Sequence, residues 1–195
     1  MIRLLFDTTI AGVRQPAGSI LNLEPTIEVG YIAKGDADRN ALPQLIGQSY
    51  AGWTRSSANS VEDASLVTLT TVTVPAGTMG LNSKLVIIVD WDYPNSASAK
   101  TLAVDLGGSN ISAIQQTTGN VAAKILLEVQ NLNNLASQKT INGSSFGVQP
   151  NARIATTEDT AFNVPIDFRC KWAAAVTSES IKLLGYSIWH YPGSS

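Results

Sequence analysis

Three aspartates near the middle of the chain have types and a spacing that could bind a metal ion or hydrolyse a glycosidic bond. Asp90 and Asp92 alternate along one predicted strand, so both side chains point to the same face, and Asp105 lies on the next predicted strand. If the two strands pair, the three carboxylates could hold calcium, or two of them could act as a glycosidase pair. The alternative is that they form the solvent-exposed face of a strand beside Lys84 and Lys100.

The single histidine and the single cysteine are the other reactive side chains that stand out. His190 lies between Trp189 and Tyr191, and no G-x-S-x-G sequence supplies a nucleophile for it, which favours a structural or interface role. Cys170 alternates with aromatic residues on an apolar face, which is typical of a small core side chain rather than a reactive thiolate. We therefore expect no catalytic residue, no metal site, no cofactor and no enzymatic activity.

The aspartates belong to a segment whose pattern predicts two long strands. Residues 83–93 alternate at period two, and residues 100–106 repeat the pattern before Gly107-Gly108. The two segments are predicted to form one long antiparallel hairpin. The residues expected on the buried face of its first strand are Leu85, Ile87, Val89, Trp91 and Tyr93.

The rest of the chain after residue 60 also consists of predicted strands. They are expected at residues 65–74, 111–116, 121–130, 137–141, 146–149, 154–157, 161–164, 165–172 and 180–191. Residues 121–130 could instead form a helix, because Ala, Leu, Lys and Glu favour one. Asn142-Gly143 is predicted to be a hairpin turn. Many strands with frequent turn signals predict an all-β fold, an antiparallel β-sandwich of the jelly-roll type.

The first 60 residues differ in character and are predicted to be a separate attachment arm, with the sandwich spanning residues 61–195. Pro25 could begin a short helix over residues 25–34. Residues 36–60 show little periodicity and are expected to be an extended linker. Trp53 in this linker would either pack back on its own sheet or insert into a partner.

Composition excludes several classes of function. The net charge is −2, so there is no basic surface for nucleic acid. Charged residues make up 14% of the chain, against about 25% in ordinary soluble domains. A surface of neutral polar side chains suits a β-rich extracellular or virion protein, or a protein that is covered by neighbouring subunits, because charge is costly to desolvate. The start of the chain lacks the apolar region of a signal peptide and no segment suits a membrane span, so we expect synthesis and folding in a cytosol.

Two segments resemble bacteriophage virion proteins. VPAGTMGLNSKLVIIVDWDY followed by KTLAVDLGG is similar to the turn and strands of jelly-roll domains in phage decoration, head-fibre and tail-fibre proteins, and AGSILNL with IAKGDA is similar to their short attachment modules. The resemblance implies a trimeric, non-enzymatic protein of the virion, assembled in the host cytoplasm. A tail fibre usually has long repetitive stretches, which this chain lacks, so a capsid decoration (cement) protein fits better.

On that reading the first 60 residues bind the major capsid protein or another virion subunit. The expected partner-contact residues are Ile2, Leu4, Phe6, Ile27, Tyr31 and Trp53. The main alternative is a tail-fibre or head-fibre domain that binds a receptor or a cell-surface glycan, which requires Trp53, Tyr93 or Asp92 in an open groove. A glycoside hydrolase would need two carboxylates in a cleft.

Overall fold

The computed structural model describes residues 43–143 and 153–193, together with five short strands within residues 1–42. The chain divides into two compact units, Met1–Gln44 and Leu45–Ser195. In the described part of the chain, no helix is long and apolar enough to cross a bilayer, and the single turn of 3-10 helix, η1, covers Val61–Ala64.

The first unit contains two small antiparallel sheets. One has the order β4-β1-β5 and the other pairs β2 with β3. The strands are β1 (Ile2–Leu4), β2 (Thr8–Ile10), β3 (Val13–Gln15), β4 (Ile20–Leu21) and β5 (Ala37–Asp38). The helix expected over residues 25–34 lies outside the described residues.

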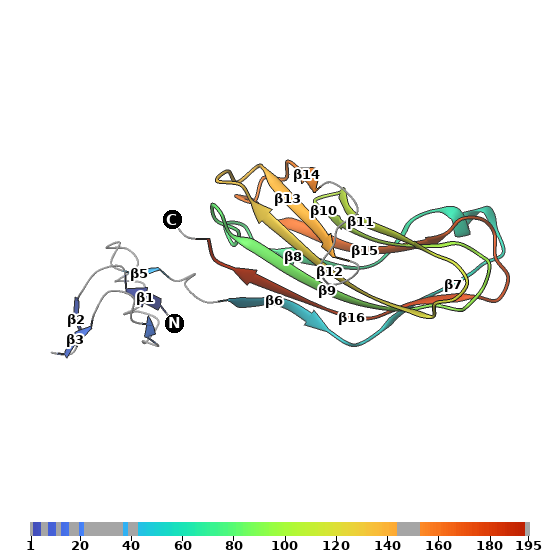
Figure 1. Cartoon of the computed structure of the whole chain (residues 1–195), viewed down its shortest axis with the longest axis horizontal. Coiled ribbons are helices and arrows are strands. Elements are labelled where there is room, and N and C mark those ends of the chain that lie inside the picture. The colour runs from blue at the N-terminus through green and yellow to red at the C-terminus, as the bar shows by residue number, and fades with distance from the viewer. Residues whose placement is uncertain are drawn as a thin grey trace. The chain divides into compact units, whose positions relative to one another are not determined.

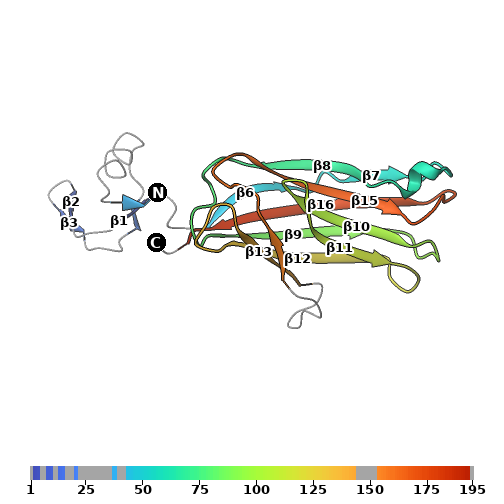
Figure 2. The same ribbon diagram turned by 90° about the horizontal axis from the view of Figure 1, so that it is seen from above.

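The second unit is a sandwich of two antiparallel sheets, as Figures 1 and 2 show. The four-stranded sheet has the order β11-β10-β15-β8, from β8 (Val67–Val74), β10 (Lys100–Leu106), β11 (Ser109–Gln116) and β15 (Val164–Trp172). The larger sheet has the order β14-β13-β12-β9-β16-β6, and β7 also pairs with β16. Its strands are β6 (Gln44–Ser49), β7 (Trp53–Ser56), β9 (Lys84–Asp92), β12 (Ala122–Asn131), β13 (Gln138–Gly143), β14 (Ile154–Thr156) and β16 (Ser180–Tyr191). The predicted all-β antiparallel sandwich is confirmed.

Period-two alternation explains the core between the two sheets. On β9 and β15, every second side chain is buried and the side chains between them are half-buried. Burying apolar side chains from both layers is the main favourable term in forming such a sandwich. The largest fully buried apolar side chains are Trp91, Trp172, Phe168, Met79, Leu85, Ile87, Leu102, Leu106 and Ile111.

The predicted hairpin between residues 83–93 and 100–106 is wrong, although both strands exist. β9 pairs with β12 and β16 in the larger sheet, whereas β10 pairs with β11 and β15 in the other. The connection over residues 93–99 therefore crosses between layers, which lie about 10 Å apart in β-sandwiches. Alternation shows which face of a strand is buried, but two strands that face each other across the core satisfy it as well as two paired neighbours do.

Other local predictions are settled by the strand pairing. Residues 122–131 form a strand, so the helical alternative is wrong. Asn142 and Gly143 are the last two residues of β13 and pair with Leu127 and Leu126, so the turn predicted at these two residues is wrong. Residues 161–163 are not a strand, and the strand expected at residues 146–149 lies outside the described residues. Gly107 and Gly108 form the hairpin turn between β10 and β11.

The segment before residue 61 contributes to the sandwich. β6 and β7 both pair with β16, and Gly47 on β6 packs so close to Val72 that an added Cβ would lie 2.9 Å from a methyl group of that valine. The expected domain boundary after residue 60 therefore falls inside the second unit.

The two ends of the sandwich are distinct. β6 begins and β16 ends at the same end, which we call the near end (Figure 1). The near end also carries the connections over residues 75–83, 132–137 and 157–163, because Lys84 pairs with both Tyr191 and Gln130, and Val74 pairs with Val164. The opposite, far end carries η1 and the connections over residues 93–99, 117–121 and 173–179.

Candidate functional site

The three aspartates do not form a cluster. Asp90 and Asp92 lie on β9 in the larger sheet, where an Asp90 carboxylate oxygen is 3.3 Å from Lys124 Nζ. Asp105 lies on β10 in the other sheet, is buried, and accepts hydrogen bonds from Arg169 and from Asn110 Nδ2, the latter at 2.7 Å. No group of three or more His, Cys, Asp or Glu side chains that could hold a metal ion occurs among the described residues. The calcium site considered for these aspartates needed all three carboxylates together, which depended on the predicted hairpin, and the described residues do not form it.

His190 and Cys170 are both core residues. His190 pairs with Leu85 across β16 and β9 and is 1% exposed; neither ring nitrogen has a hydrogen-bond partner, and burial lowers the pKa of the imidazole. Cys170 is fully buried, and burial raises the pKa of its thiol to about 11. A thiol with that pKa is almost entirely protonated at neutral pH, so it is not a nucleophile.

The aromatic residues proposed for a glycan groove are used in packing. Tyr93 is buried, and its hydroxyl donates to the carbonyl of Ala122 at 3.0 Å. Trp53 is half-buried and stacks on Tyr186 with ring centroids 5.7 Å apart, and Tyr186 stacks on Phe168 at 4.8 Å. Trp53 thus packs back on its own sheet.

The remaining expected contact residues belong to the first unit. Ile2 and Leu4 lie on β1. Phe6, Ile27 and Tyr31 are outside the described residues. Their role in binding a partner stays a prediction.

At the far end, Arg55 joins β7 to the other sheet. Its guanidinium donates to the carbonyls of Cys170 at 2.6 Å, Glu62 at 2.8 Å and Ser65 at 2.9 Å, and it lies 5.1 Å from the centre of the Trp172 ring. A hollow of about 460 Å³ lies beside this group. Because these carbonyls already occupy the guanidinium, the hollow is a structural feature rather than an anion site.

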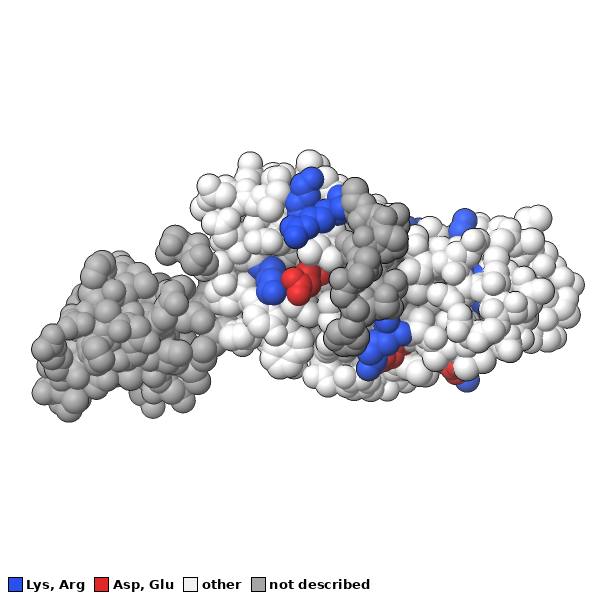
Figure 3. All heavy atoms as spheres, viewed as in Figure 1, with Lys and Arg blue, Asp and Glu red and all other residues white. Residues whose placement is uncertain are grey.

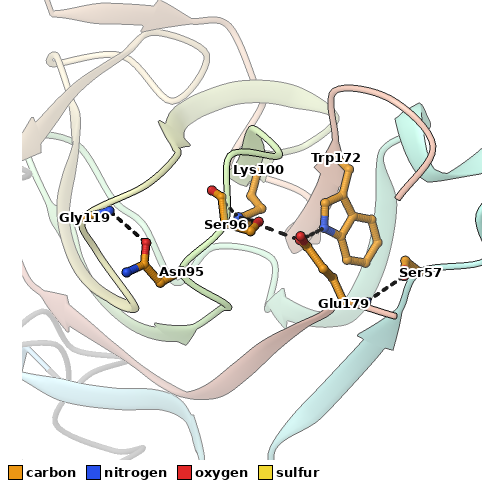
Figure 4. A network of polar contacts seen from close by, with 7 residues as sticks. All are labelled: Ser57, Asn95, Ser96, Lys100, Gly119, Trp172 and Glu179. Atoms are coloured by element: carbon orange, nitrogen blue, oxygen red, sulfur yellow. Dashed lines mark hydrogen bonds and ion pairs between the residues drawn. The ribbon is translucent and has the colours of Figure 1, made fainter. Parts of the chain in front are cut away.

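A second far-end group centres on a buried lysine (Figure 4). Lys100 is fully buried, and its Nζ donates to Ser96 Oγ at 2.6 Å and lies 3.7 Å from Glu179 Oε2. The same Glu179 oxygen accepts from Trp172 Nε1 at 3.1 Å, and the Glu179 backbone N–H donates to Ser57 Oγ at 2.9 Å. These bonds satisfy a lysine that would otherwise be costly to bury, and they tie three connections together.

At the near end, a buried polar network holds three connections in place. Asn131 Nδ2 donates to the carbonyl of Gly80 at 3.0 Å and to Thr160 Oγ1 at 2.9 Å. Gln138 Nε2 donates to Asn131 Oδ1 at 3.0 Å and to the carbonyl of Glu158 at 2.9 Å. The loops at this end are therefore fixed by side-chain bonds as well as by backbone bonds.

Four large apolar side chains are exposed at the near end, close to this hydrogen-bond network. We call them the apolar tip: Leu81 (49% exposed), Leu132 (39%), Phe162 (69%) and Tyr191 (36%). Asn133 N–H donates to Asn82 Oδ1 at 2.9 Å, which places two of the loops side by side. Ala76 N–H donates to Asn163 Oδ1 at 2.8 Å, which adds the third.

Sequence reasoning missed the apolar tip, although a signal for it exists. Leu81, Leu132 and Phe162 are each followed directly by an asparagine in a loop. Asn82 and Asn133 adopt positive φ values of 57° and 51°, a conformation that asparagine tolerates better than most residues. The repeated pair of a large apolar residue and an asparagine therefore indicates each loop separately. It does not indicate that the three loops lie together.

Charged groups are sparse on the face of the sandwich that Figure 3 shows, where scattered blue and red side chains interrupt a largely neutral surface. This agrees with the low charge content of the sequence.

Comparisons with known proteins give only distant structural likenesses. No family model matches the chain, and no curated protein matches it. Solved structures that it resembles include the CBM2 module of the evolved Dit of Lactobacillus casei BL23 phage J-1, with 6% identity, TM-score 0.35, and coverage of 64% of this chain and 69% of that one. A glycosyl hydrolase family protein from Mycobacterium fortuitum has 7% identity, TM-score 0.32, and coverage of 61% and 68%.

A viral capsid protein gives a similar result. VP2 of an infectious bursal disease virus subviral particle has 11% identity and TM-score 0.27. The match covers 90% of this chain and 47% of VP2. These identities and TM-scores are too low for the likenesses to carry an argument about function.

Proposed function

We propose that this chain is a non-enzymatic structural protein of a bacteriophage virion, specifically a capsid decoration (cement) protein that binds the lattice of the major capsid protein and stabilises the head. The resemblance of residues 74–93 and 100–108 to phage virion proteins supports the virion role. The low charge content supports a protein whose surface is covered by neighbouring subunits.

The observation that carries the proposal is the apolar tip. Leu81, Leu132 and Phe162 are exposed on loops that a buried hydrogen-bond network holds in place, and Tyr191 is exposed at the end of β16. Apolar groups gathered on one exposed surface, rather than scattered singly, are typical of interaction sites. A preordered surface also loses little entropy on binding, because its loops are already fixed.

The reactive side chains support a non-enzymatic role. Asp105 is bonded to Arg169, Lys100 lies beside Glu179, and both His190 and Cys170 are buried in the core. Each of these groups has a structural environment, and none faces an open cleft.

The first unit supplies a second contact in this proposal. Its apolar residues Ile2, Leu4, Phe6, Ile27 and Tyr31 would bind the capsid surface, and the sandwich would add the apolar tip. Two weak contacts on one chain raise the overall affinity, since the second binding event becomes intramolecular.

The test measures binding to phage heads assembled without this protein. A Leu81→Ser/Phe162→Ser variant removes two tip side chains, each worth about 1.5–3 kcal/mol if fully buried, so we expect binding to weaken at least about tenfold. The matched control is Val61→Ser/Val121→Ser, because those valines are 86% and 54% exposed at the far end. Co-sedimentation gives the affinity, and cryo-electron microscopy of the heads shows the position.

Two results would count against the proposal in different ways. Wild-type protein that leaves the heads undecorated would overturn the decoration role. Equal binding of the tip variant and its far-end control would remove the apolar tip as the contact.

The receptor-binding or glycan-binding alternative has less support. It requires an open groove around Trp53, Tyr93 or Asp92, whereas Tyr93 is buried and Trp53 is stacked on Tyr186. Binding of the same wild-type protein to a glycan array would favour it.

A further inference from the structure

Strand β8 forms an open edge of the four-stranded sheet, as the view in Figure 2 shows. Its sequence, VTLTTVTV, contains no charged residue and no proline. Among the described strands, β15 is its one hydrogen-bonded neighbour. Natural proteins usually protect such an edge with charges, prolines, bulges or a covering segment, because a free edge pairs readily with another strand.

The other sheet edges differ from β8, although β8 itself contacts β7 of the larger sheet. β11 contacts β13 and β14, and Asn142 Nδ2 donates to Ser112 Oγ at 2.8 Å on that side. β14 is only three residues long. β6 is also an uncharged edge, and it lies beside β8 because Gly47 packs on Val72. One side of the sandwich therefore presents two uncharged edges, of which β8 is the longer.

The backbone groups that point outward from β8 follow from one hydrogen bond on its neighbour. Gly107 N–H donates to the Pro165 carbonyl at 2.8 Å, so the backbone of Pro165 faces β10 and not β8. Thr73, which lies opposite Pro165, must then direct its own N–H and C=O away from β15. By alternation, Thr71 does the same. Both residues are exposed.

A bulge limits the regular part of this edge. The register between β8 and β15 shifts between Phe168 and Arg169, so the uninterrupted part runs from Thr70 to Val74. The charged neighbour Asp167 is held on the outer face of the sheet by a hydrogen bond from Thr71 Oγ1. It does not project from the edge in the way a protecting charge would.

We propose that β8 pairs antiparallel with β8 of a second copy of this chain, which joins two four-stranded sheets across a two-fold axis. With Val72 facing its own copy at the axis, Thr71 of each chain lies opposite Thr73 of the other, and each such pair can exchange two N–H···O bonds. The occupant is a second copy because the arrangement of outward groups is complementary to itself. An uncharged strand also brings no like charges together when it meets its copy.

This inference goes beyond the proposed function and does not depend on it. A self-paired edge closes at two copies, whereas the resemblance to phage virion proteins implies three. The neighbouring edge strand β6 is also uncharged, so it brings no repulsion to the same side of the contact.

The test uses the full chain and two variants of the residues whose backbone groups point outward, and Thr71→Lys also removes the hydroxyl that donates to Asp167. Thr73→Pro removes an N–H that β15 does not use, a position at which edge strands accept proline. Thr71→Lys places a lysine opposite Thr73 of the other copy, so that the two added like charges lie on either side of the axis. Thr117→Lys is the matched control, because Thr117 is exposed in a far-end loop and its substitution adds the same charge.

Sedimentation equilibrium at micromolar concentrations gives the mass, and thermal unfolding followed by circular dichroism confirms the fold of each variant. We expect wild type and Thr117→Lys to be dimers, and both edge variants to dissociate at least about tenfold more readily. Amide hydrogen exchange should be slow at Thr71 and Thr73 in the wild type and fast in Thr71→Lys.

Several outcomes would overturn the inference. They are a wild-type monomer, a wild-type trimer, or a Thr71→Lys dimer as stable as the control. A wild-type monomer whose Thr71→Lys variant fails to bind heads would show that a strand of the capsid takes the edge. Because mass in solution needs no phage head, failure here and failure of the decoration role are distinguishable.

Discussion

At the scale of single residues, His190 is the least satisfied polar group in the described core. Its imidazole lies on the inner face of β16 with no hydrogen-bond partner for either nitrogen. Burial lowers its pKa because the charged form loses hydration without gaining a partner. The residue therefore makes folding sensitive to acid.

The sign of that sensitivity follows from proton linkage. The unfolded histidine has its ordinary pKa, near 6.5, and binds a proton before the folded one does. The free energy of unfolding should be steady above that pH and fall below it, by up to about 1.4 kcal/mol per unit of depression. Urea unfolding at neutral and mildly acidic pH should show a smaller fall for His190→Leu. An identical fall in both proteins would contradict the prediction.

The buried Lys100–Glu179 pair gives a second prediction at this scale. Lys100→Met leaves Glu179 without its cation, and breaking a buried pair costs about 3–5 kcal/mol. The double variant Lys100→Met/Glu179→Gln should recover much of that loss, because the amide oxygen still accepts from Trp172. Chemical denaturation measures both.

The half-exposed pair Lys84–Glu128 is the matched control for this experiment. Its side chains are each 38% exposed, and Lys84→Met should cost less than about 1 kcal/mol. A double variant no more stable than Lys100→Met would show that lost packing, rather than the unpaired carboxylate, dominates.

At the scale of elements, β6 and β7 show that the sandwich begins before residue 61. Deleting residues 1–43 removes the first unit and leaves both strands, so we expect a cooperatively unfolding sandwich whose binding to phage heads is weakened. Deleting residues 1–60 removes both strands, the Trp53 ring on Tyr186 and the Arg55 hydrogen bonds. We expect that shorter chain to lose cooperative thermal unfolding, measured by circular dichroism. Equal thermal stability of the two truncations would contradict this assignment.

The same strands show how much of the fold could be predicted from the sequence. Alternation correctly predicted the buried faces of β9 and β15, because burial of a face has a period of two residues. It could not predict that β9 and β10 belong to different sheets, since pairing depends on contacts far apart in the chain. The turn expected at Asn142-Gly143 was wrong because pairing with β12 overrides a local turn preference.

The candidate site was harder to predict than the fold. The aspartates and the histidine drew attention because of their chemistry, yet each has a structural environment. The apolar tip combines Leu81, Leu132 and Phe162 from three separate loops, so no local pattern joins them. The open edge was visible as an uncharged strand, but its position at the end of a sheet was not.

At the scale of the whole molecule, the sandwich separates its two proposed contacts. The apolar tip lies at the near end, and the β8 edge runs along one side. Neither overlaps the far end, where Arg55, Lys100 and Glu179 tie the connections together. Because the two β8 strands would run antiparallel, a dimer formed through β8 would carry its two apolar tips at opposite ends, with one tip free to bind the lattice.

The far end is suited to carrying an inserted peptide, because β6 begins and β16 ends at the opposite, near end (Figure 1). A foreign peptide inserted between Thr117 and Thr118 would extend from that far end, and Asn95, which accepts a hydrogen bond from Gly119 N–H, would still anchor the loop. On a decorated capsid, such an insertion would present many regularly spaced copies of an antigen to the surrounding solution.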